Sequence, residues 1–176
     1  MSKAEQKALL LLGGLAALFL ALTSRSLAIP GVAKSGNDLY ALADEIVRGY
    51  FNRSNVDPMM LTAMAMIESS GNPLAVRYEP GIGDASIGLM QTLTGTARWL
   101  ATDMGYTDFG VPSMDDLLDP ATSMYFGAAY VNWLRNYGGQ RRSDEWVVKS
   151  YNGGPGANNS QVENHWAKYQ AALAAL

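Results

Sequence analysis

The sequence contains no cysteine, and His165 is the only histidine among its 176 residues. Without cysteine the chain has no disulfide bond and no thiolate metal site. A single histidine also argues against a histidine-rich metal centre and against a serine–histidine catalytic triad. The composition therefore predicts a protein without a metal site.

Basic residues are also few. Once residues 1–28 are set aside, 10 Lys and Arg stand against 15 Asp and Glu, which gives a net charge of −5. A body with this charge is a poor binder of nucleic acid. Long-range attraction toward any other anionic polymer is equally unfavourable, so binding to one would need a local groove. We therefore expect no nucleic-acid partner.

The N-terminus carries the longest hydrophobic run. Two lysines precede residues 8–22, which are uncharged and rich in leucine and alanine. The run is membrane-directed but shorter than the roughly 20 residues that a spanning helix prefers. Residues 26–28, Ser-Leu-Ala, resemble a signal-peptide cleavage site. Residues 1–28 are therefore predicted to be either a secretory signal peptide or an uncleaved hydrophobic helix that contacts the membrane through residues 8–22. Residues 29–36 are predicted to be a linker.

No strand pattern of substantial length appears in the remaining chain, whereas helix starts and stops recur. We expect one mainly α-helical domain over residues 37–176, capped at Asp57, Asp119 and Ser143, with a capping box of Ser160 and Glu163. The segment 76–87 has no helical period and is expected to be a loop or a small hairpin. The predicted helices run from Asn37 or Asp38 to about 52, from Pro58 to Glu68, from Thr94 to Met104, from Pro120 to a stop at Gly138-Gly139, from Asp144 to Tyr151, and from Ser160 onward.

Glu68 is the first candidate for catalysis. It ends an apolar helix, and the sequence Ser69-Ser70-Gly71-Asn72-Pro73 follows it. The partial negative charge of a helix C-terminus disfavours an ionised carboxylate, and apolar neighbours reduce its solvation. Glu68 is therefore either an acid that keeps its proton or an ordinary surface residue in the last turn of a helix.

Two neutral polar clusters help to decide between these interpretations. One is Gly88-Leu89-Met90-Gln91, and the other is Tyr151-Asn152 followed by Gly153-Gly154-Pro155-Gly156. An amide can bind a hydroxyl or N-acetyl group without adding charge, and cleavage of a glycosidic bond requires a protonated acid. Each cluster alone is typical of a plain turn, but together with Glu68 they indicate a glycan-cleaving enzyme.

The order and spacing of four motifs resemble the soluble lytic transglycosylase (SLT) domain, a family related to goose-type lysozyme. The resemblance spans residues 39–156, and its motifs lie at 57–73, 88–97, 118–130 and 151–156. It implies a lysozyme-like fold of the α+β superfamily with minimal β structure. It also implies cleavage of the β-1,4 bond between N-acetylmuramic acid and N-acetylglucosamine in peptidoglycan glycan strands.

The resemblance further implies the roles of individual residues. Glu68 would be the catalytic acid and then the base, closing a 1,6-anhydro ring on the muramoyl sugar. Substrate-binding positions would be Ser69, Met90, Gln91, Tyr151 and Asn152. No metal or organic cofactor is implied.

The segment 76–87 is longer than the family often has, and it adds Glu79 and Asp84. A second carboxylate at about 6.5–9.5 Å from Glu68 would activate water and make the enzyme a hydrolysing lysozyme. The alternative is a loop in which Glu79 pairs with Arg77 or Lys34 and Asp84 is exposed. A hypothesis of another class is a membrane-tethered, non-catalytic protein that binds glycan or serves in assembly.

The expected location is the cell envelope, with the domain secreted to the periplasm or anchored in the membrane and facing the wall. A membrane-containing virus particle is the other candidate. The four tryptophans are expected to pack in the core rather than to stack on sugars, because their helical spacing is that of core residues. His165, beyond the matching region, is expected to be a surface or partly packed side chain.

Overall fold

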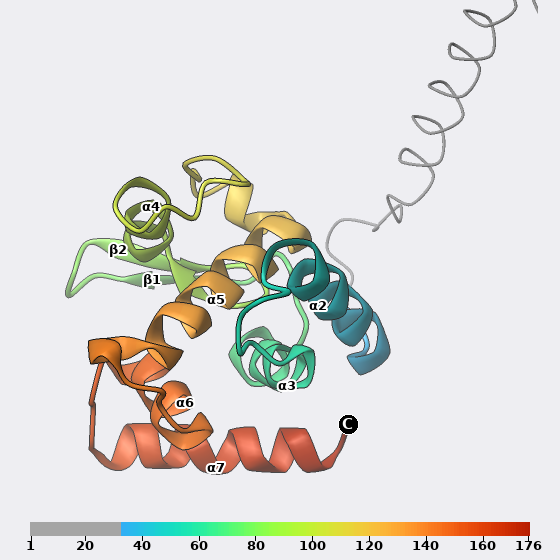
Figure 1. The fold of residues 1–176 in the computed structure, drawn as a ribbon, viewed down its shortest axis with the longest axis vertical. Helices are drawn as coiled ribbons and strands as arrows, with labels where there is room; N and C mark the ends of the chain where they lie inside the picture. Colours follow the sequence, from blue (N-terminus) through green and yellow to red (C-terminus); the bar gives the residue numbers. More distant parts are fainter. Residues whose placement is uncertain (1–32) are drawn as a thin grey trace, which may run out of the picture. The chain divides into compact units, whose positions relative to one another are not determined.

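The structure is a computed structural model, and it describes residues 33–176 (Figure 1). The predictions for residues 1–28, and for all but the end of the linker 29–36, lie outside the described residues. Among residues 33–176, no helix combines the length and the apolar character needed to cross a membrane.

The described chain is mainly helical, with one small sheet, as the sequence predicts. Figure 1 shows α5 running through the middle of the body, between the hairpin with α4 at one end and α6 with α7 at the other. The elements in chain order are α2 (Gly36–Tyr50), α3 (Pro58–Ser69), β1 (Val76–Glu79), β2 (Asp84–Ile87), β3 (Thr92–Leu93), α4 (Thr94–Thr102), η1 (Asp116–Leu118), α5 (Pro120–Arg135), η2 (Tyr137–Gly139), α6 (Asp144–Gly153) and α7 (Ser160–Ala174).

Three predicted N-caps are confirmed. The first backbone N–H groups of a helix have no partner within it, and a short polar side chain can accept their hydrogen bonds. Asp57 accepts from the N–H of Met59 at the start of α3. Asp119 and Ser143 do the same for α5 and α6.

Two caps differ from the prediction. α2 begins earlier than expected, because Ser35 accepts from the N–H of Asp38 and forms a capping box with it. The capping box of Ser160 and Glu163 is wrong, since Asn159 caps α7 and accepts from the N–H groups of Gln161 and Val162. In both cases a side chain one or two residues upstream of the predicted cap has the extended backbone that a cap requires.

The segment 76–87 is a hairpin, which settles the alternative that the sequence left open. β1 and β2 pair antiparallel from Val76 opposite Ile87 to Glu79 opposite Asp84, and β3 pairs with the other edge of β2. Glu79 and Asp84 are therefore the strand pair next to the turn at residues 80–83.

The core is built around α3 and α5. Residues Met60 to Ala65 of α3 are all buried and, apart from Thr62, apolar, so this helix is buried around its whole circumference. Such a helix is stable only when neighbours cover every side, and α2, α5 and α7 pack against it. The helix that ends at Glu68 is thus held on all sides by other elements.

Candidate active site

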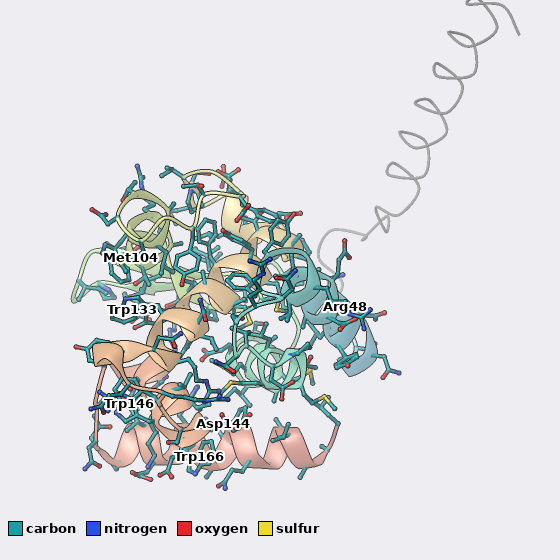
Figure 2. All side chains as sticks on the ribbon, in the orientation of Figure 1. Arg48, Met104, Trp133, Asp144, Trp146 and Trp166 are labelled. Carbon is teal, nitrogen blue, oxygen red and sulfur yellow. The ribbon has the colours of Figure 1, made fainter. Side chains whose placement is uncertain are left out.

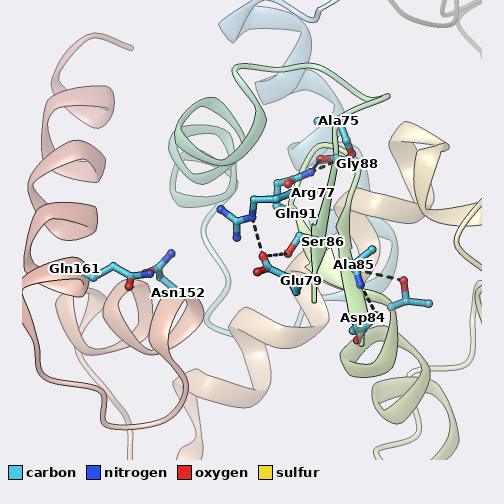
Figure 3. Close-up of polar contacts among 11 residues, drawn as sticks. Ala75, Arg77, Glu79, Asp84, Ala85, Ser86, Gly88, Gln91, Asn152 and Gln161 are labelled. Carbon is cyan, nitrogen blue, oxygen red and sulfur yellow. Dashed lines mark hydrogen bonds and ion pairs between the residues drawn. The ribbon is translucent and has the colours of Figure 1, made fainter. Parts of the chain in front are cut away.

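A cleft of about 370 Å³ opens at the end of α3, between the sheet on one side and α5 and α6 on the other. Five predicted site residues line it: Glu68, Glu79, Gln91, Tyr151 and Asn152. Figure 3 shows Arg77, Glu79 and Gln91 facing Asn152 and Gln161 across an open space. The tertiary fold therefore brings together groups from residues 68 to 161.

Glu68 is the second-last residue of α3, and its side chain is only 9% exposed. Its Oε1 atom is fully buried and has no hydrogen bond within the described residues. Oε2 is not enclosed in this way and is the oxygen available to the cleft. The helix ends directly afterwards, because Ser70 and Gly71 take positive φ angles of 55° and 73°.

Gln91 is fixed by its own amide. Its Nε2 group donates to the carbonyl oxygens of Ala75, at 3.1 Å, and Gly88, at 3.0 Å, as drawn in Figure 3. Both amide protons are therefore used, and Oε1 remains as an acceptor for a ligand in the cleft. The backbone of Gln91 has φ of 47°, so the turn holds this residue in an uncommon conformation.

Tyr151 joins α6 to the same turn. Its hydroxyl donates to the carbonyl oxygen of Met90 at 2.9 Å, and it lies 3.0 Å from Oγ1 of Thr92. A phenol has one proton, so the Thr92 hydroxyl is the donor in the second bond. Burial, followed by the nearby charge of Glu68, raises the pKa of Tyr151, which keeps the phenol neutral and able to donate.

The hairpin adds a charged pair to the cleft wall. Oε1 of Glu79 accepts from Nε of Arg77 at 2.7 Å and from Oγ of Ser86 at 3.3 Å. Of the partners expected for Glu79, Arg77 is therefore the one observed. Asp84 does not line the cleft. Its two carboxyl oxygens accept from the backbone N–H groups of Ala85 and Gly95, so it connects β2 to the start of α4.

Comparison with protein-family models matches residues 45–173 to the Transglycosylase SLT domain. The chain belongs to this family. The match covers the cleft and extends through α7, beyond the region in which the sequence motifs are recognisable.

Two curated relatives have similar sequences. Both are endo-type membrane-bound lytic murein transglycosylase A, one from Klebsiella pneumoniae strain 342 and one from K. pneumoniae subsp. pneumoniae strain ATCC 700721 / MGH 78578. Each is 38% identical over 82 residues, which are 46% of this chain and 37% of the relative. The SLT domain thus aligns with little more than a third of these relatives.

Two solved structures are similar in fold. The complex of the 70-kDa soluble lytic transglycosylase with bulgecin A has a TM-score of 0.50 and 23% identity, over 78% of this chain and 21% of that one. The crystal structure of the 70-kDa soluble lytic transglycosylase from Escherichia coli gives 0.49 and 26%, over 73% and 19%. The first of these shows a common fold.

Two predicted substrate-binding residues of this SLT domain do not line the cleft. The hydroxyl of Ser69 faces the carbonyl oxygens of Leu89, at 2.9 Å, and Ala65, at 3.1 Å. Met90 is fully buried, and its side chain packs against Gly127 of α5. Through these contacts both residues help to hold the end of α3 and the turn in place.

Asn152 lies in the cleft as predicted, where its Oδ1 accepts from Nε2 of Gln161 at 3.2 Å. The cleft also contains Arg77, Ser86, Tyr130 and Gln161, none of which the sequence singled out as site residues. Tyr130 belongs to a recognised motif, and Gln161 lies in the first turn of α7, outside every motif. Only the packing of α7 and α6 brings Gln161 to Asn152.

The four tryptophans pack against the core, as expected. Figure 2 shows Trp133 on α5, Trp146 on α6 and Trp166 on α7. Trp133 meets Tyr137 edge to face and Trp146 meets it in a tilted arrangement, at ring-centroid distances of 5.1 and 5.5 Å.

His165 is not the surface or partly packed residue that the sequence suggested. It is buried, and its Nε2 lies 3.2 Å from Oε1 of Glu68. One sequence signal points to it, because Val162, His165 and Tyr169 follow each other at steps of three and four and form the buried face of α7. The sequence contains that periodicity, but it does not show which helix this face meets.

Proposed function

We propose that this SLT domain is a peptidoglycan lytic transglycosylase that cleaves the β-1,4 bond between N-acetylmuramic acid and N-acetylglucosamine. Its family, and the names of its relatives, support this substrate. The observation that carries the proposal is the position of Glu68, a carboxyl group enclosed by the end of α3 with one oxygen open to a polar cleft.

Glu68 acts twice in the proposed reaction. As an acid it gives its proton to the glycosidic oxygen while the bond from that oxygen to C1 of the muramoyl sugar breaks, and the bonding electrons leave with the oxygen. As a carboxylate it then takes the proton of the muramoyl 6-hydroxyl while that oxygen attacks C1. Glu68 regains its proton, no water is consumed, and the product carries a 1,6-anhydro ring.

The neighbours position the sugar. The free Oε1 of Gln91 can accept a hydrogen bond from a sugar hydroxyl or from the N–H of an N-acetyl group. Tyr151 and Thr92 fix the turn that carries Gln91, while Asn152 and Tyr130 form the opposite wall. The substrate's own N-acetyl group stabilises the developing positive charge, so neither a second carboxylate nor a cofactor is needed.

Hydrolysis by a lysozyme-type mechanism is the second candidate, because Glu79 lines the same cleft. A carboxylate in that position would activate water as a base. Glu79 is instead bound to Arg77 and Ser86, which occupy Oε1. Asp84 is a weaker candidate for this role, since backbone N–H groups occupy both of its oxygens outside the cleft.

We place the protein in the cell envelope, with the domain facing the wall. The relatives are named as membrane-bound, and residues 1–28 would serve either as a signal peptide or as the anchor. A membrane-containing virus particle would present the domain to the wall in the same way. The intact mass of native material distinguishes a cleaved signal peptide from a retained anchor.

The decisive experiment is digestion of purified peptidoglycan by the full chain, followed by mass spectrometry of the products. We expect 1,6-anhydro ends, and we expect Glu68→Gln to lower the rate by about 10²- to 10⁴-fold while leaving the fold intact. Glu45→Gln, an exposed site on α2, is the matched control and should keep full activity. Products with reducing ends would show that the enzyme is a hydrolysing lysozyme. Binding of glycan without any cleavage would show that the protein is non-catalytic.

A further inference from the structure

The only histidine of the chain lies against the proposed catalytic acid. α7 packs on α3 and brings Nε2 of His165 to 3.2 Å from Oε1 of Glu68. The two side chains are 10% and 9% exposed, and both of these atoms are fully buried without a hydrogen bond in the described part of the chain. Buried polar atoms of this kind are rare, because leaving one unpaired costs roughly 1–3 kcal/mol.

The chemistry of the two groups decides how they can pair. If Nε2 carries a proton, it can donate to Oε1, and the acid proton of Glu68 then resides on Oε2. If Nε2 is unprotonated, it accepts a hydrogen bond from Glu68, and the acid proton then lies on Oε1, on the side away from the cleft. Only the first arrangement leaves the transferable proton facing a substrate. Nδ1 is not enclosed as Nε2 is, so it can accept from water when Nε2 holds the proton.

We propose that His165 is a positioning residue for Glu68: its Nε2–H group faces Oε1, keeps the acid proton on Oε2, and stabilises the carboxylate after that proton has left. The inference rests on the proposed function, in which Glu68 is the acid and base. His165 neither gains nor loses a proton during the cycle, so the balance of the reaction is unchanged. The two atoms already lie within hydrogen-bonding distance, at 3.2 Å.

Other charged groups on the packed elements have partners of their own. Lys149 of α6 is bound to Glu145 and Glu163, Arg135 of α5 to Asp144, and Arg77 of the hairpin to Glu79. Tyr151 and Tyr169, on α6 and α7, have raised pKa values, chiefly through burial. Within residues 33–176, His165 is thus the one basic side chain in contact with Glu68.

Removal of the imidazole has two expected effects. Without a donor at Oε1 the carboxylate is less stable, so Glu68 keeps its proton to higher pH and the alkaline limb of kcat/KM moves upward. The same loss makes the carboxylate harder to form in the transition state, so kcat falls by roughly 10- to 100-fold. KM should change little, because His165 does not line the cleft.

The first test uses the full chain and the fact that it has a single histidine. The position of the imidazole proton is determined by ¹⁵N NMR in the wild type and in Glu68→Gln. The proposal requires the proton on Nε2 in the wild type, where it faces Oε1 of Glu68. A wild-type imidazole with its proton on Nδ1 and an unprotonated Nε2 would overturn the proposal, and this test does not depend on how a histidine variant folds.

The second test compares His165→Gln with His165→Phe. Glutamine keeps an N–H donor close to the position of Nε2, whereas phenylalanine keeps the ring volume without a donor. We expect the lowered kcat and shifted alkaline limb in His165→Phe, and recovery of most of the activity in His165→Gln. A purely packing role is indicated if His165→Phe loses stability but keeps the wild-type pH profile, and that result would overturn the proposal.

Failure of this inference is distinct from failure of the proposed function. Activity in Glu68→Gln would remove Glu68 as the catalyst. An inactive Glu68→Gln, combined with wild-type kcat and pH profile in His165→Phe, would overturn the role of His165 alone. If His165→Phe does not fold, the NMR measurement of which imidazole nitrogen carries the proton in the wild type still gives the answer.

Discussion

Tyr151 donates its phenol proton to the carbonyl oxygen of Met90 at 2.9 Å, although the two residues are 61 positions apart in the sequence. This bond ties the end of α6 to the turn that carries Gln91. The conformation of the turn that carries Gln91 therefore depends on α6, a helix that lies much further along the sequence. Several of the expected mutational effects arise from this dependence.

Tyr151→Phe should destabilise the protein by about 1–3 kcal/mol, because the Met90 carbonyl loses its donor inside the protein. The rate of glycan cleavage should fall as the turn loosens. Denaturant unfolding and initial rates measure the two effects. Tyr130→Phe is the control for stability, since the Tyr130 hydroxyl has no hydrogen bond in the described structure and lies in the same cleft. Equal destabilisation by both substitutions would contradict the role given to the Tyr151 bond.

Gln91→Glu should disrupt the turn more than Gln91→Met does. A carboxylate would face the carbonyl oxygens of Ala75 and Gly88, to which the amide now donates, whereas methionine only removes the two bonds. We expect both variants to bind glycan more weakly and Gln91→Glu to have the lower melting temperature. The opposite order of melting temperatures would mean that the amide is not oriented as described.

Gly127→Ala tests the contact that α5 makes with Met90, in the same turn that Tyr151 contacts. A Cβ atom at Gly127 would lie 2.5 Å from Cγ of Met90, whose side chain is fully buried and cannot move aside. Overpacking of this kind costs about 1–3 kcal/mol, and it should also lower kcat by displacing the turn. Gly49→Ala in α2 has open space around it and should be neutral or stabilising by up to about 1 kcal/mol. A neutral Gly127→Ala would show that the turn accommodates the methyl group.

Glu79→Gln distinguishes the two reaction mechanisms. If Glu79 only pairs with Arg77 and Ser86, its loss should leave the 1,6-anhydro product unchanged and alter the rate by less than about 10-fold. Product analysis by mass spectrometry is the measurement. Asp84→Asn is the companion variant, and it should affect stability through its bonds to Ala85 and Gly95 but not the product. Loss of activity of about 100-fold or more in Glu79→Gln would support the hydrolase instead.

Stability should decrease in alkaline solution. Burial, followed by the charges of Asp144 and Asp57, raises the pKa of Tyr169 to about 12 from about 10. A phenol whose pKa is raised by folding contributes stability that is fully present below the unfolded value and is lost as pH rises through the folded one. The free energy of unfolding should therefore fall between pH values of about 10 and 12. In Tyr169→Phe this part of the pH dependence should be smaller, and an identical slope would contradict the assignment.

Much of the fold could be predicted because its signals are local. Asp57 before Pro58, Asp119 before Pro120 and Ser143 mark helix starts through contacts within the first turn. Periodic apolar residues then mark the buried faces. The errors are local as well: Ser35 and Asn159 cap α2 and α7 because more than one nearby side chain can fill a cap, and backbone geometry selects between them.

The cleft was predicted in part. Glu68, Gln91, Tyr151 and Asn152 lie in it as the motifs indicate, since each motif places a polar group beside a helix end or a turn. Ser69 and Met90 belong to the same motifs but face the interior. A motif gives residue types and spacing, whereas the direction of a side chain depends on the surfaces that pack against it.

The sequence by itself determined the helical character of the chain, most of its helix starts, and the order of the motifs that identify its family. These features depend on residues that are near neighbours in the chain. Only the tertiary structure decided that Glu79 pairs with Arg77, that Asp84 serves the start of α4, and that His165 meets Glu68. The last contact joins residues that are 97 positions apart, and it exists because the buried face of α7 packs on α3 as well as on α6.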